Sequence, residues 1–275
     1  MDTHADTHIL LSKNLASETA GQKRVQTVVQ DLHRVLMDFM DKHQITHEEY
    51  RLATGILVGT VKAGEESLLY DVFLEAKATD IGNDGRQGSP EGIEGPFYFP
   101  GAPKLTPPYV LPQRPDERGD ALYFFGRVTN TDGEPIAGAE LDFWQADAQG
   151  LYSNVAPTVP DWNLRGRIET DEQGLYEVKT IVPPPYEIPK NGPTGVLLTA
   201  LGAPHFFRPA HMHIMVRHPD YQDLITQLYF RGGEYTDSDV AHAVRDDLFT
   251  TFTARTSAGD STYEAQYDFA LKAKF

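Results

Sequence analysis

Residues 122–144 read LYFFGRVTNTDGEPIAGAELDFW and contain two alternating segments joined by a turn. Apolar side chains occupy every second position around Leu122 and Phe124, and a second alternation begins at Leu141. The Asp-Gly pair at 132–133, between the two segments, is typical of a tight hairpin turn. Because neighbouring side chains of a strand point to opposite faces, this pattern predicts two half-buried β-strands.

Further alternating segments follow toward the C-terminus, each bounded by turn residues. The strand-like segments lie at 167–170, 176–180, 211–216 and 224–230. Most of the 19 prolines also lie in this half, in clusters at 96–115 and 183–193 that indicate extended loops. Short alternating segments separated by turns are typical of an antiparallel β-sandwich, so we predict an all-β domain over residues 91–275.

The N-terminal part of the chain shows the helical period instead. Apolar side chains recur three and four positions apart between residues 25 and 40, which places them on one face of a helix. Thr46 and Glu49 have the spacing of a capping box, which predicts the start of a second helix. Residues 80–92 are rich in Gly, Asp and Asn and are interpreted as a loop or linker. We therefore predict an α-helical domain over residues 1–90.

The composition restricts the classes of function. Lys and Arg number 24 against 40 Asp and Glu, a formal net charge of −16 that would be repelled by nucleic acid or an anionic membrane. The absence of cysteine excludes disulfides, thiolate catalysis and Cys-ligated metal sites. No apolar run has the length of a signal peptide core or a membrane span. We expect no nucleic-acid partner, no membrane insertion and a cytoplasmic location.

Two histidines lie on the strand predicted at residues 211–216. His211 and His213 project from one face of that strand, whereas Met212 and Ile214 point to the other face and into the core. Two adjacent imidazoles can bind a transition metal. A bare His-x-His pair is more often part of a polar surface, so the spacing alone does not establish a metal site.

A metal site would need donors besides these imidazoles. Cysteine is absent, and Arg217 and His218 occupy the positions where a site of two His and one carboxylate would have its acidic ligand. Tyrosine is the remaining donor type. Of the 13 tyrosines, Tyr152 and Tyr186 differ from the rest because they lie in predicted turns rather than in alternating strands.

Several short motifs, taken in order along the chain, resemble those of one enzyme family. They are Glu94–Tyr98 (EGPFY), Phe143–Asp147 (FWQAD), Gly150–Ser153 (GLYS), Leu164–Ile168 (LRGRI), Pro183–Tyr186 (PPPY), Asn191–Pro193 (NGP) and Arg208–His213 (RPAHMH). On these motifs the chain resembles the intradiol ring-cleavage dioxygenases, from its helical N-terminus to about residue 250. It is similar to the catechol and hydroxyquinol branch, whose members begin with a helical domain used for dimerisation.

The resemblance implies a non-haem Fe(III) ion as cofactor. Its ligands would be Tyr152, Tyr186, His211 and His213. Phenolate is a hard anionic donor that favours Fe(III), and coordination makes ionisation of a buried phenol favourable. The implied reaction inserts both atoms of O2 into a catechol-type aromatic diol and cleaves the ring between its hydroxyl-bearing carbons. The product would be a muconate-type dicarboxylate, or maleylacetate if the substrate is hydroxyquinol.

Three residues would act in catalysis according to the resemblance. Tyr186 would be displaced by the diol and take up a proton. Arg208 would stabilise charge on the ring as oxygen adds, and Gln227 would form a hydrogen bond near that arginine. Without the resemblance, Arg208 and Gln227 would be interpreted as ordinary polar residues of a loop and a strand.

The same resemblance supplies a set of substrate-binding residues. They are Leu68, Asp71, Ile93, Gly95, Pro96, Phe97, Ile188, Pro189, Arg208, Val240 and Ala241. Asp71 matches an acidic position of hydroxyquinol enzymes, where it would accept a hydrogen bond from a third ring hydroxyl; it would otherwise be a solvated helix residue. Phe97 and Ile188-Pro189 also resemble that type, whereas Ile93-Glu94 and residues 240–248 resemble catechol enzymes. We therefore favour hydroxyquinol, with catechol or chlorocatechol as the alternative substrate.

The resemblance further implies the partners of the protein. These would be a catechol-type small molecule and O2. The N-terminal helices would form a homodimer, with a phospholipid at the dimer interface.

Two other interpretations are compatible with the residues alone. One is a zinc or copper protein that binds its metal through His211 and His213 without the tyrosines. The other is a non-catalytic β-sandwich binding module that holds no metal. Arg165 and Arg167 are predicted to anchor acidic loops, with no role in catalysis.

Overall fold

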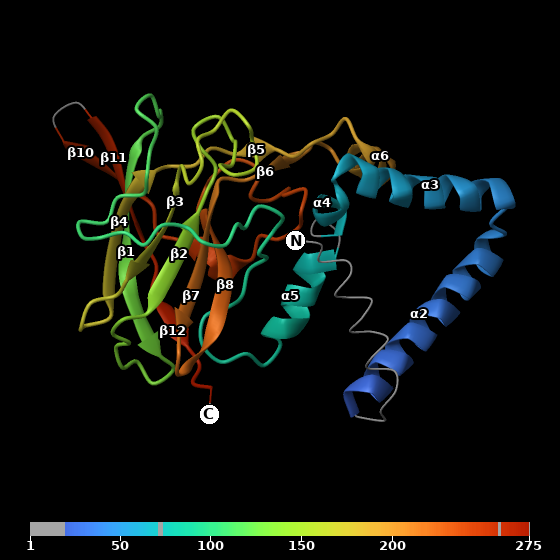
Figure 1. Cartoon of the computed structure of the whole chain (residues 1–275), viewed down its shortest axis with the longest axis horizontal. Helices are drawn as coiled ribbons and strands as arrows, with labels where there is room; N and C mark the ends of the chain where they lie inside the picture. The colour runs from blue at the N-terminus through green and yellow to red at the C-terminus, as the bar shows by residue number, and fades with distance from the viewer. Residues whose placement is uncertain (1–19, 71–73, 258–259, 275) are drawn as a thin grey trace. The chain divides into compact units, whose positions relative to one another are not determined.

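The computed structural model describes residues 20–70, 74–257 and 260–274. The internal contacts divide the chain into two compact units, one up to Val58 and one from Gly59 onward, which are described separately (Figure 1). This division falls inside helix α3 (His47–Ala63). The domain boundary between residues 90 and 91, which rests on the change of sequence period, stays a prediction.

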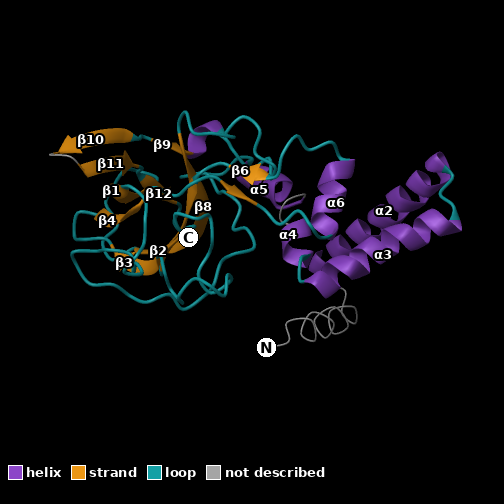
Figure 2. Ribbon diagram, turned by 90° about the horizontal axis from the view of Figure 1, so that it is seen from above, coloured by secondary structure: helices purple, strands orange, loops and turns teal. Residues whose placement is uncertain are grey.

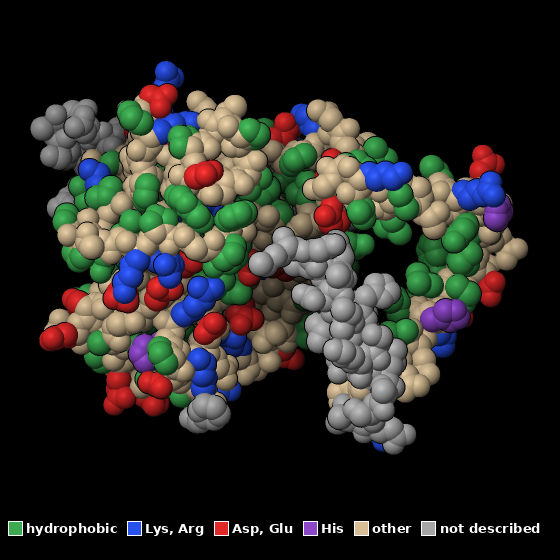
Figure 3. Space-filling view, viewed as in Figure 1, with side chains coloured by type: hydrophobic (Ala, Val, Ile, Leu, Met, Phe, Trp, Pro, Cys, Tyr) green, Lys and Arg blue, Asp and Glu red, His purple; other side chains and the backbone are tan. Residues whose placement is uncertain are grey.

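The first unit consists of helix α2 (Ala20–His43) and most of α3. The predicted capping box begins α3: the Thr46 amide donates to Glu49 Oε2 at 2.8 Å, and the Glu49 amide donates to Thr46 Oγ1 at 3.3 Å. The apolar side chains of α2 remain exposed, for example Leu32 at 57% (Figure 3). Among the helices formed by described residues, none combines the length and the apolar character needed to cross a membrane.

The second unit contains the end of α3 and several shorter helices. These are α4 (Glu66–Tyr70), α5 (Ala76–Asn83), α6 (Pro193–Ala200) and the 3-10 helix η2 (Asp246–Leu248). Residues 80–83 belong to α5, so the prediction of a loop over all of 80–92 is wrong at its start. The Asn83 side chain donates to the Glu91 carbonyl oxygen at 2.9 Å and accepts from the Glu91 amide at 2.8 Å. These two bonds hold the C-terminal end of α5 against the segment around Glu91. The local sequence pattern does not predict this contact.

Within the described residues, the strands of the second unit form two five-stranded sheets and one two-stranded sheet. The first sheet contains β1 (Ala121–Asn130), β4 (Leu175–Ile181), β10 (Thr253–Ser257), β11 (Asp260–Gln266) and β12 (Phe269–Leu271). The second has the order β3-β2-β7-β8-β9: β3 (Arg165–Glu169), β2 (Glu140–Trp144), β7 (His211–His218), β8 (Tyr221–Phe230) and β9 (Phe249–Thr250). The small sheet pairs β5 (Tyr186–Glu187) with β6 (Phe207–Arg208).

The strand pairing is mixed, which corrects the expectation of a uniformly antiparallel arrangement. β1 pairs with β4, β2 with β3 and β7, β7 with β8, and β10 with β11 in antiparallel register. β1 pairs with β11 and β12, and β8 with β9, in parallel register. The alternation within one strand cannot reveal this difference, because side chains alternate with a period of two in both kinds of sheet.

Figure 2 shows the strands of the second unit as ribbons. Apolar side chains from both large sheets pack into one buried core. The rings of Phe124 on β1 and Phe143 on β2 lie 6.0 Å apart in an edge-to-face contact. Met212 and Ile214 of β7 belong to this core, as the alternation along that strand predicts. The other face of β7 is therefore available for the two histidines.

Candidate active site

The four side chains predicted as metal ligands come together in the second unit, and we refer to them as the Tyr/His cluster. His211 and His213 extend from β7, Tyr152 follows a turn after β2, and Tyr186 begins β5. The two histidine Nε2 atoms lie 3.1 Å apart, and Tyr152 Oη lies 3.4 Å from His211 Nε2. The rings of Tyr152 and Tyr186 are 5.6 Å apart. All four side chains are buried, so two phenols and two imidazoles share one interior site.

The turn before Tyr152 has a backbone conformation that requires glycine. Asp147 Oδ1 accepts two amide hydrogen bonds within the turn, each at 2.9 Å. Gly150 has a φ of +80°, and a Cβ at this position would lie 2.7 Å from Tyr186 Cβ. Glycine satisfies both conditions without strain because it has no Cβ. Gly150 therefore lets the segments that carry the two tyrosines approach each other.

Tyr186 and Arg208 are held opposite each other by the two-stranded sheet. They pair across β5 and β6, whereas the sequence predicts a turn at each of them. A strand of two residues after a run of prolines has no alternation from which it could be recognised. The pairing brings Arg208 beside the Tyr/His cluster.

His211 is neutral, and its proton position follows from its partners. Its Nδ1 lies 2.8 Å from the Pro209 carbonyl oxygen, and since a carbonyl only accepts, Nδ1 carries the proton. The Nε2 atom then has the lone pair, to which Arg208 Nη1 donates at 3.2 Å. Burial, followed by the charge of Arg208, lowers the pKa of His211 to about 3. Its Nε2 is therefore an available donor atom for a metal.

His213 stacks on a neighbouring ring, and its Nε2 contacts His211 Nε2 at 3.1 Å. The Trp144 ring lies 4.8 Å from the His213 ring with 11° between the planes. Within the described residues, neither His213 Nδ1 nor Trp144 Nε1 has a hydrogen-bond partner. Burial, and then the electrostatic interactions with His211 and with the charged Arg208, lowers the pKa of His213 well below its usual value. The sequence alone indicates only a core or pocket-edge position for Trp144, because stacking partners far apart in sequence leave no local signal.

The stack continues away from the Tyr/His cluster. Tyr98 lies 4.9 Å from Trp144 between ring centroids, and its hydroxyl donates to Asp142 Oδ2 at 3.2 Å. Asp142 is buried on β2, and burial raises its pKa to about 6 although Tyr98 and Arg217 act in the opposite direction. A titratable carboxyl thus lies three contacts from the proposed ligand His213, through Tyr98 and Trp144.

The donor set fits a ferric ion. His211 Nε2 presents a lone pair to the cluster, and His213 Nε2 lies 3.1 Å from it, whereas His213 Nδ1 has no hydrogen-bond partner among the described residues. Burial raises the pKa of Tyr152 and Tyr186, whereas the charge of Arg208 acts to lower both values. Phenolate and imidazole are suitable donors for a trivalent iron ion. Among the described residues, no three His, Cys, Asp or Glu side chains are grouped to hold a metal, and the side chains grouped with the two histidines here are the tyrosines.

Arg208 is the centre of a buried hydrogen-bond network. Its Nη2 donates to Gln227 Oε1 and to Tyr229 Oη, both at 3.0 Å, and its Nε donates to Asp239 Oδ1 at 3.2 Å. Burial acts to lower the pKa of Arg208, but the charges of Asp239 and the nearby phenols raise it well above its usual value. Arg208 is therefore charged beside the Tyr/His cluster, with Gln227 next to it as the resemblance implies.

Two members of this network are not predicted by the sequence. Asp239 accepts amide hydrogen bonds from Ala241 and Ala243, each at 3.1 Å, in addition to its pairing with Arg208. Burial raises the pKa of Asp239, but Arg208 and the amide bonds lower it further, so the net shift is downward. Tyr229 follows Gln227 by two residues on β8 and shares its face, a signal that could have identified it. Asp239 lies in a loop without periodicity and has no such signal.

A small pocket lies beside the Tyr/His cluster. Its lining residues are Leu68, Ile93, Pro96, Phe97, Tyr186, Ile188, Arg208 and Ala241. Most of the predicted substrate-binding residues are therefore brought together. The wall is apolar apart from Tyr186 and Arg208, as expected for a site that binds an aromatic ring and orients it through a few polar groups.

The remaining predicted pocket residues have other locations. Val240 packs in the apolar cluster beside the pocket, and a Cβ on Gly95 would lie 3.5 Å from His213 Cε1. Pro189 is exposed and does not line the pocket, because it follows the buried Ile188 in an extended segment where neighbours point to opposite sides. Asp71 lies outside the described residues.

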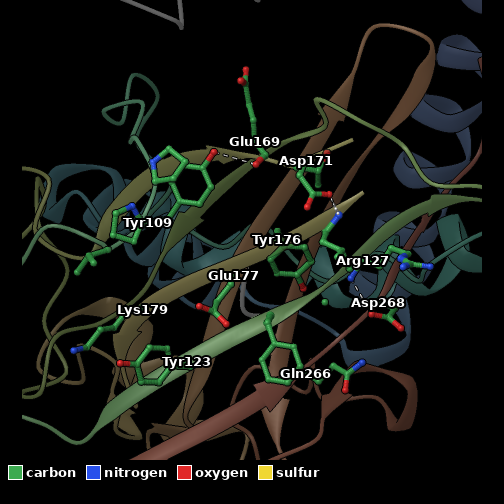
Figure 4. Close-up of a pocket in the computed structure, with 17 residues that line it drawn as sticks. Tyr109, Tyr123, Arg127, Glu169, Asp171, Tyr176, Glu177, Lys179, Gln266 and Asp268 are labelled. Atoms are coloured by element: carbon green, nitrogen blue, oxygen red, sulfur yellow. Dashed lines mark hydrogen bonds between the residues drawn. The ribbon is translucent and has the colours of Figure 1, made fainter. Parts of the chain in front are cut away.

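A larger hollow lies on the face of β1 and β4 opposite to the core. Its volume is about 1100 Å³, and it is lined by these strands and the segment 107–110 (Figure 4). Tyr109 Oη donates to the Glu169 carbonyl oxygen at 3.2 Å, and Lys179 Nζ lies 5.5 Å from the centroid of the Tyr123 ring. No predicted ligand or catalytic residue lines this hollow, whereas Tyr186 and Arg208 line the smaller pocket.

Comparisons with known proteins agree with the motifs. A family model described as dioxygenase matches residues 93–273. The chlorocatechol 1,2-dioxygenase of Rhodococcus opacus is 38% identical over 251 residues, which cover 90% of this chain and 98% of the relative. The 6-chlorohydroxyquinol 1,2-dioxygenase of Cupriavidus pinatubonensis is 34% identical and covers 98% of this chain and 97% of the relative.

Solved structures give the same result. The 3-chlorocatechol 1,2-dioxygenase of Rhodococcus opacus has a TM-score of 0.85 at 41% identity, covering 91% of this chain and 99% of its own. The hydroxyquinol 1,2-dioxygenase of Pseudomonas putida has a TM-score of 0.82 at 29% identity and covers 96% of each chain. Both similarities extend over nearly the whole sequence.

Proposed function

We propose that this chain, which belongs to the intradiol dioxygenase family, inserts both atoms of O2 into a catechol-type diol and opens the ring between its hydroxyl-bearing carbons. One observation carries the proposal. Two buried phenols and two neutral imidazoles meet beside an apolar pocket that also contains the charged Arg208. The relatives are enzymes, so the interpretation as a non-catalytic binding module has no support.

The Tyr/His cluster would hold a non-haem Fe(III) ion, which when bound would make a chelated diol reactive toward O2. The chain itself supplies proton transfer and charge stabilisation. Tyr186 Oη would accept a proton from the diol, and it lies under the influence of the Arg208 charge. Arg208 lines the pocket and would stabilise negative charge on the ring, because Asp239 keeps it ionised and oriented.

Hydroxyquinol and a chlorinated catechol are the two candidate substrates. Asp71 would accept a hydrogen bond from a third ring hydroxyl and favours hydroxyquinol. The apolar wall formed by Leu68, Ile93 and Phe97 favours an apolar substituent and agrees with the names of the similar enzymes. Asp71→Ala should reduce kcat/KM for hydroxyquinol at least about tenfold more than for 3-chlorocatechol. Equal losses would exclude recognition of the third hydroxyl by Asp71.

The visible absorption spectrum of the iron-replete protein tests the ligand set. Phenolate bound to Fe(III) should give a broad charge-transfer band, and a folded, iron-loaded but colourless protein would contradict the proposal. His211→Ala should lose the iron and the band. His218→Ala, at the other end of the same strand, is the matched control and should retain both.

The alternative with zinc or copper on the histidines alone gives a different result. It predicts that Tyr152→Phe and Tyr186→Phe retain full metal content by elemental analysis. The proposal predicts that each variant loses or shifts the charge-transfer band, since each phenol is a donor. Metal content and spectrum together therefore separate the two ligand sets.

The exposed apolar face of α2 supports a homodimer through the N-terminal helices. Val29, Leu32 and Val35 are 58%, 57% and 54% exposed, although such residues normally become buried. Leu32→Glu should convert a dimer into a monomer in light scattering. Extraction and mass spectrometry of the same samples would detect a phospholipid, which should be lost with the dimer. A wild-type monomer without lipid would contradict both parts.

A further inference from the structure

Arg165 is a buried arginine without a carboxylate partner. It lies on β3 and is 1% exposed. Within the described residues, no Asp or Glu forms an ion pair with it, and Asp142 acts on it only from a longer distance. Arg167, two residues farther along β3, pairs with Glu140 at 3.2 Å. Arg167 thus pairs with an acidic residue, although one on strand β2 rather than in the predicted acidic loop, and the prediction of an acidic partner is wrong for Arg165.

The Arg165 guanidinium joins two parts of the active site. Its Nε donates to Ser153 Oγ and its Nη2 to the Ser153 carbonyl oxygen, both at 2.9 Å. Nη2 also donates to the Phe97 carbonyl oxygen at 2.8 Å. Ser153 directly follows Tyr152, and Phe97 lines the pocket. Arg165 thus connects the segment of a proposed ligand to the wall that contacts the substrate.

The charge of Arg165 lies against the Tyr152 phenol. Its Cζ atom is 5.9 Å from the centroid of the Tyr152 ring, and the Phe97 ring is 4.7 Å from the same ring. Arg165 Nη1 has no hydrogen-bond partner among the described residues. The neutral groups around Arg165 therefore leave one nitrogen of its guanidinium without a hydrogen bond, and the Tyr152 ring lies close to the same guanidinium.

Burial of an unpaired guanidinium is unfavourable, whereas a neutral side chain could make similar hydrogen bonds without that cost. The hydrogen bonds alone do not explain why the position carries a charge. The nearest group that becomes anionic in the proposed function is Tyr152. A positive charge at this distance stabilises electron density on the phenolate, because Coulomb interactions are strong in a buried site.

We propose that Arg165 is a positioning residue for Tyr152: its charge stabilises the anionic donor, and its hydrogen bonds fix the donor segment against the Phe97 wall. This inference rests on the proposed function, because Tyr152 becomes an anionic donor only when it binds the metal. Groups that contact a metal ligand without binding the metal commonly change the ligand's orientation and the metal affinity. Arg165 would have this effect on Tyr152.

Arg165→Gln, Arg165→Lys and Arg167→Gln test the inference, each purified with iron and compared with the wild type. The glutamine of Arg165→Gln retains hydrogen-bonding capacity but no charge, so the phenolate electrons are held less strongly. The charge-transfer band should move to longer wavelength, and iron should bind about 10- to 100-fold more weakly in competition with a chelator. Arg165→Lys keeps the charge and should keep the band near its wild-type position. Arg167→Gln should leave band and iron affinity unchanged.

The outcomes separate this inference from the proposed function. A wild-type band that Arg165→Gln leaves in place, with unchanged iron affinity, overturns the role of Arg165 and leaves the enzyme assignment intact. A band that moves equally in the Lys and Gln variants shows that charge is not the cause and also overturns it. If Arg165→Gln does not fold, Arg165→Lys decides the question. A charge-transfer band shifted from the wild-type wavelength, together with weaker iron binding in Arg165→Lys, refutes the inference. A colourless iron-loaded wild type refutes the proposed function and this inference together.

Discussion

His211 and His213 lie two residues apart on β7, yet the surroundings of the two imidazoles differ in kind. His211 donates from Nδ1 to the Pro209 carbonyl oxygen and accepts from Arg208, which belongs to a network closed by Asp239. His213 stacks on Trp144 and has no described hydrogen-bond partner at Nδ1. One side of the site is organised by charge and hydrogen bonds, and the other by ring contacts.

This difference has physical consequences for the two ligands. A hydrogen bond to a carbonyl fixes both the ring orientation and the nitrogen that carries the proton. A stacked ring fixes the plane of the imidazole but not its proton. We therefore expect the His211 side to be most sensitive to the loss of a charged side chain in the Arg208 network. The His213 side should be most sensitive to the size of the stacked ring and to the ionisation of Asp142 at the far end of the ring contacts.

The largest effect should come from Asp239→Asn, which leaves Arg208 buried without its carboxylate. Loss of one partner of a buried ion pair typically costs about 3–5 kcal/mol of unfolding free energy. Urea denaturation measures this loss, and kcat should fall because Arg208 is no longer oriented. Asp237→Asn, at an exposed position two residues earlier, is the control and should change the unfolding free energy little. An Asp239→Asn variant as stable as the wild type would remove the distinction between the two sides.

The next effect concerns Asp142, at the far end of the ring contacts on the His213 side. Its folded-state pKa of about 6 lies above the usual 3.8, so the folded protein binds the proton more tightly than the unfolded chain. The contribution of Asp142 to stability is therefore complete below pH 3.8 and is lost as the pH rises through 6. A pKa difference of this size corresponds to about 3 kcal/mol.

Asp142→Asn should remove this pH dependence. The difference in unfolding free energy between the variant and the wild type should increase in favour of the variant between about pH 4 and pH 8, as measured by urea denaturation across that range. Asp223→Asn removes an exposed carboxylate that also faces Arg217, and it is the control for the loss of a charge beside this arginine. Parallel pH profiles for wild type and Asp142→Asn would show that Asp142 ionises normally.

A smaller effect is expected from Trp144→Phe, which shortens the ring stacked on His213. Removal of part of a buried indole should cost about 2 kcal/mol of unfolding free energy through lost contacts. The charge-transfer band should broaden, because the His213 imidazole gains freedom to rotate. Trp162→Phe is the control, since Trp162 is only partly buried and does not contact the Tyr/His cluster. An unchanged spectrum in Trp144→Phe would show that the stack does not hold the ligand.

The smallest effect should come from Glu75→Gln, which lies behind the segment that carries Pro96 and Phe97 of the pocket wall. Glu75 accepts from the amides of Glu94 at 2.6 Å and Gly95 at 3.1 Å, and thereby fixes the segment that leads to Phe97. A glutamine keeps one acceptor and loses the charge, at a cost of about 1 kcal/mol, so KM should rise about fivefold with kcat nearly constant. Steady-state kinetics with a catechol substrate measure both constants. A lower kcat at constant KM would place the effect on the Tyr/His cluster instead.

Local periodicity accounts for much of the fold and for part of the site. The capping box at Thr46, the strands around Phe124 and Phe143 and the shared face of His211 and His213 all follow from residues close in sequence. The parallel pairing of β1 and the two-residue strands β5 and β6 depend on partners far along the chain. No local pattern contains that information.

The same limit applies to the site residues. The tyrosines are identified through motifs of a family, because a single tyrosine has no feature that marks it as a ligand. Asp239, Trp144 and Arg165 act through contacts with residues that are distant in sequence, so their roles become visible only in the structure. The predicted role of Asp71 stays a prediction, because this residue lies outside the described residues.

The parallel pairing of β1 with β11 also determines when the protein can fold during synthesis. Ala121 pairs with Thr262, about 140 residues later, and Phe269 of β12 completes the core. At ribosomal rates of about 5–20 residues per second, β1 leaves the ribosome on the order of ten seconds before its parallel partners β11 and β12 exist, although β4 follows sooner. During that interval the edge of β1 is open to other chains. Contacts of such long sequence separation also fold slowly. Folding of the first sheet can therefore finish only after the C-terminal strands have been synthesised. The yield of folded protein should depend on chaperone capacity more than on the final stability of the fold.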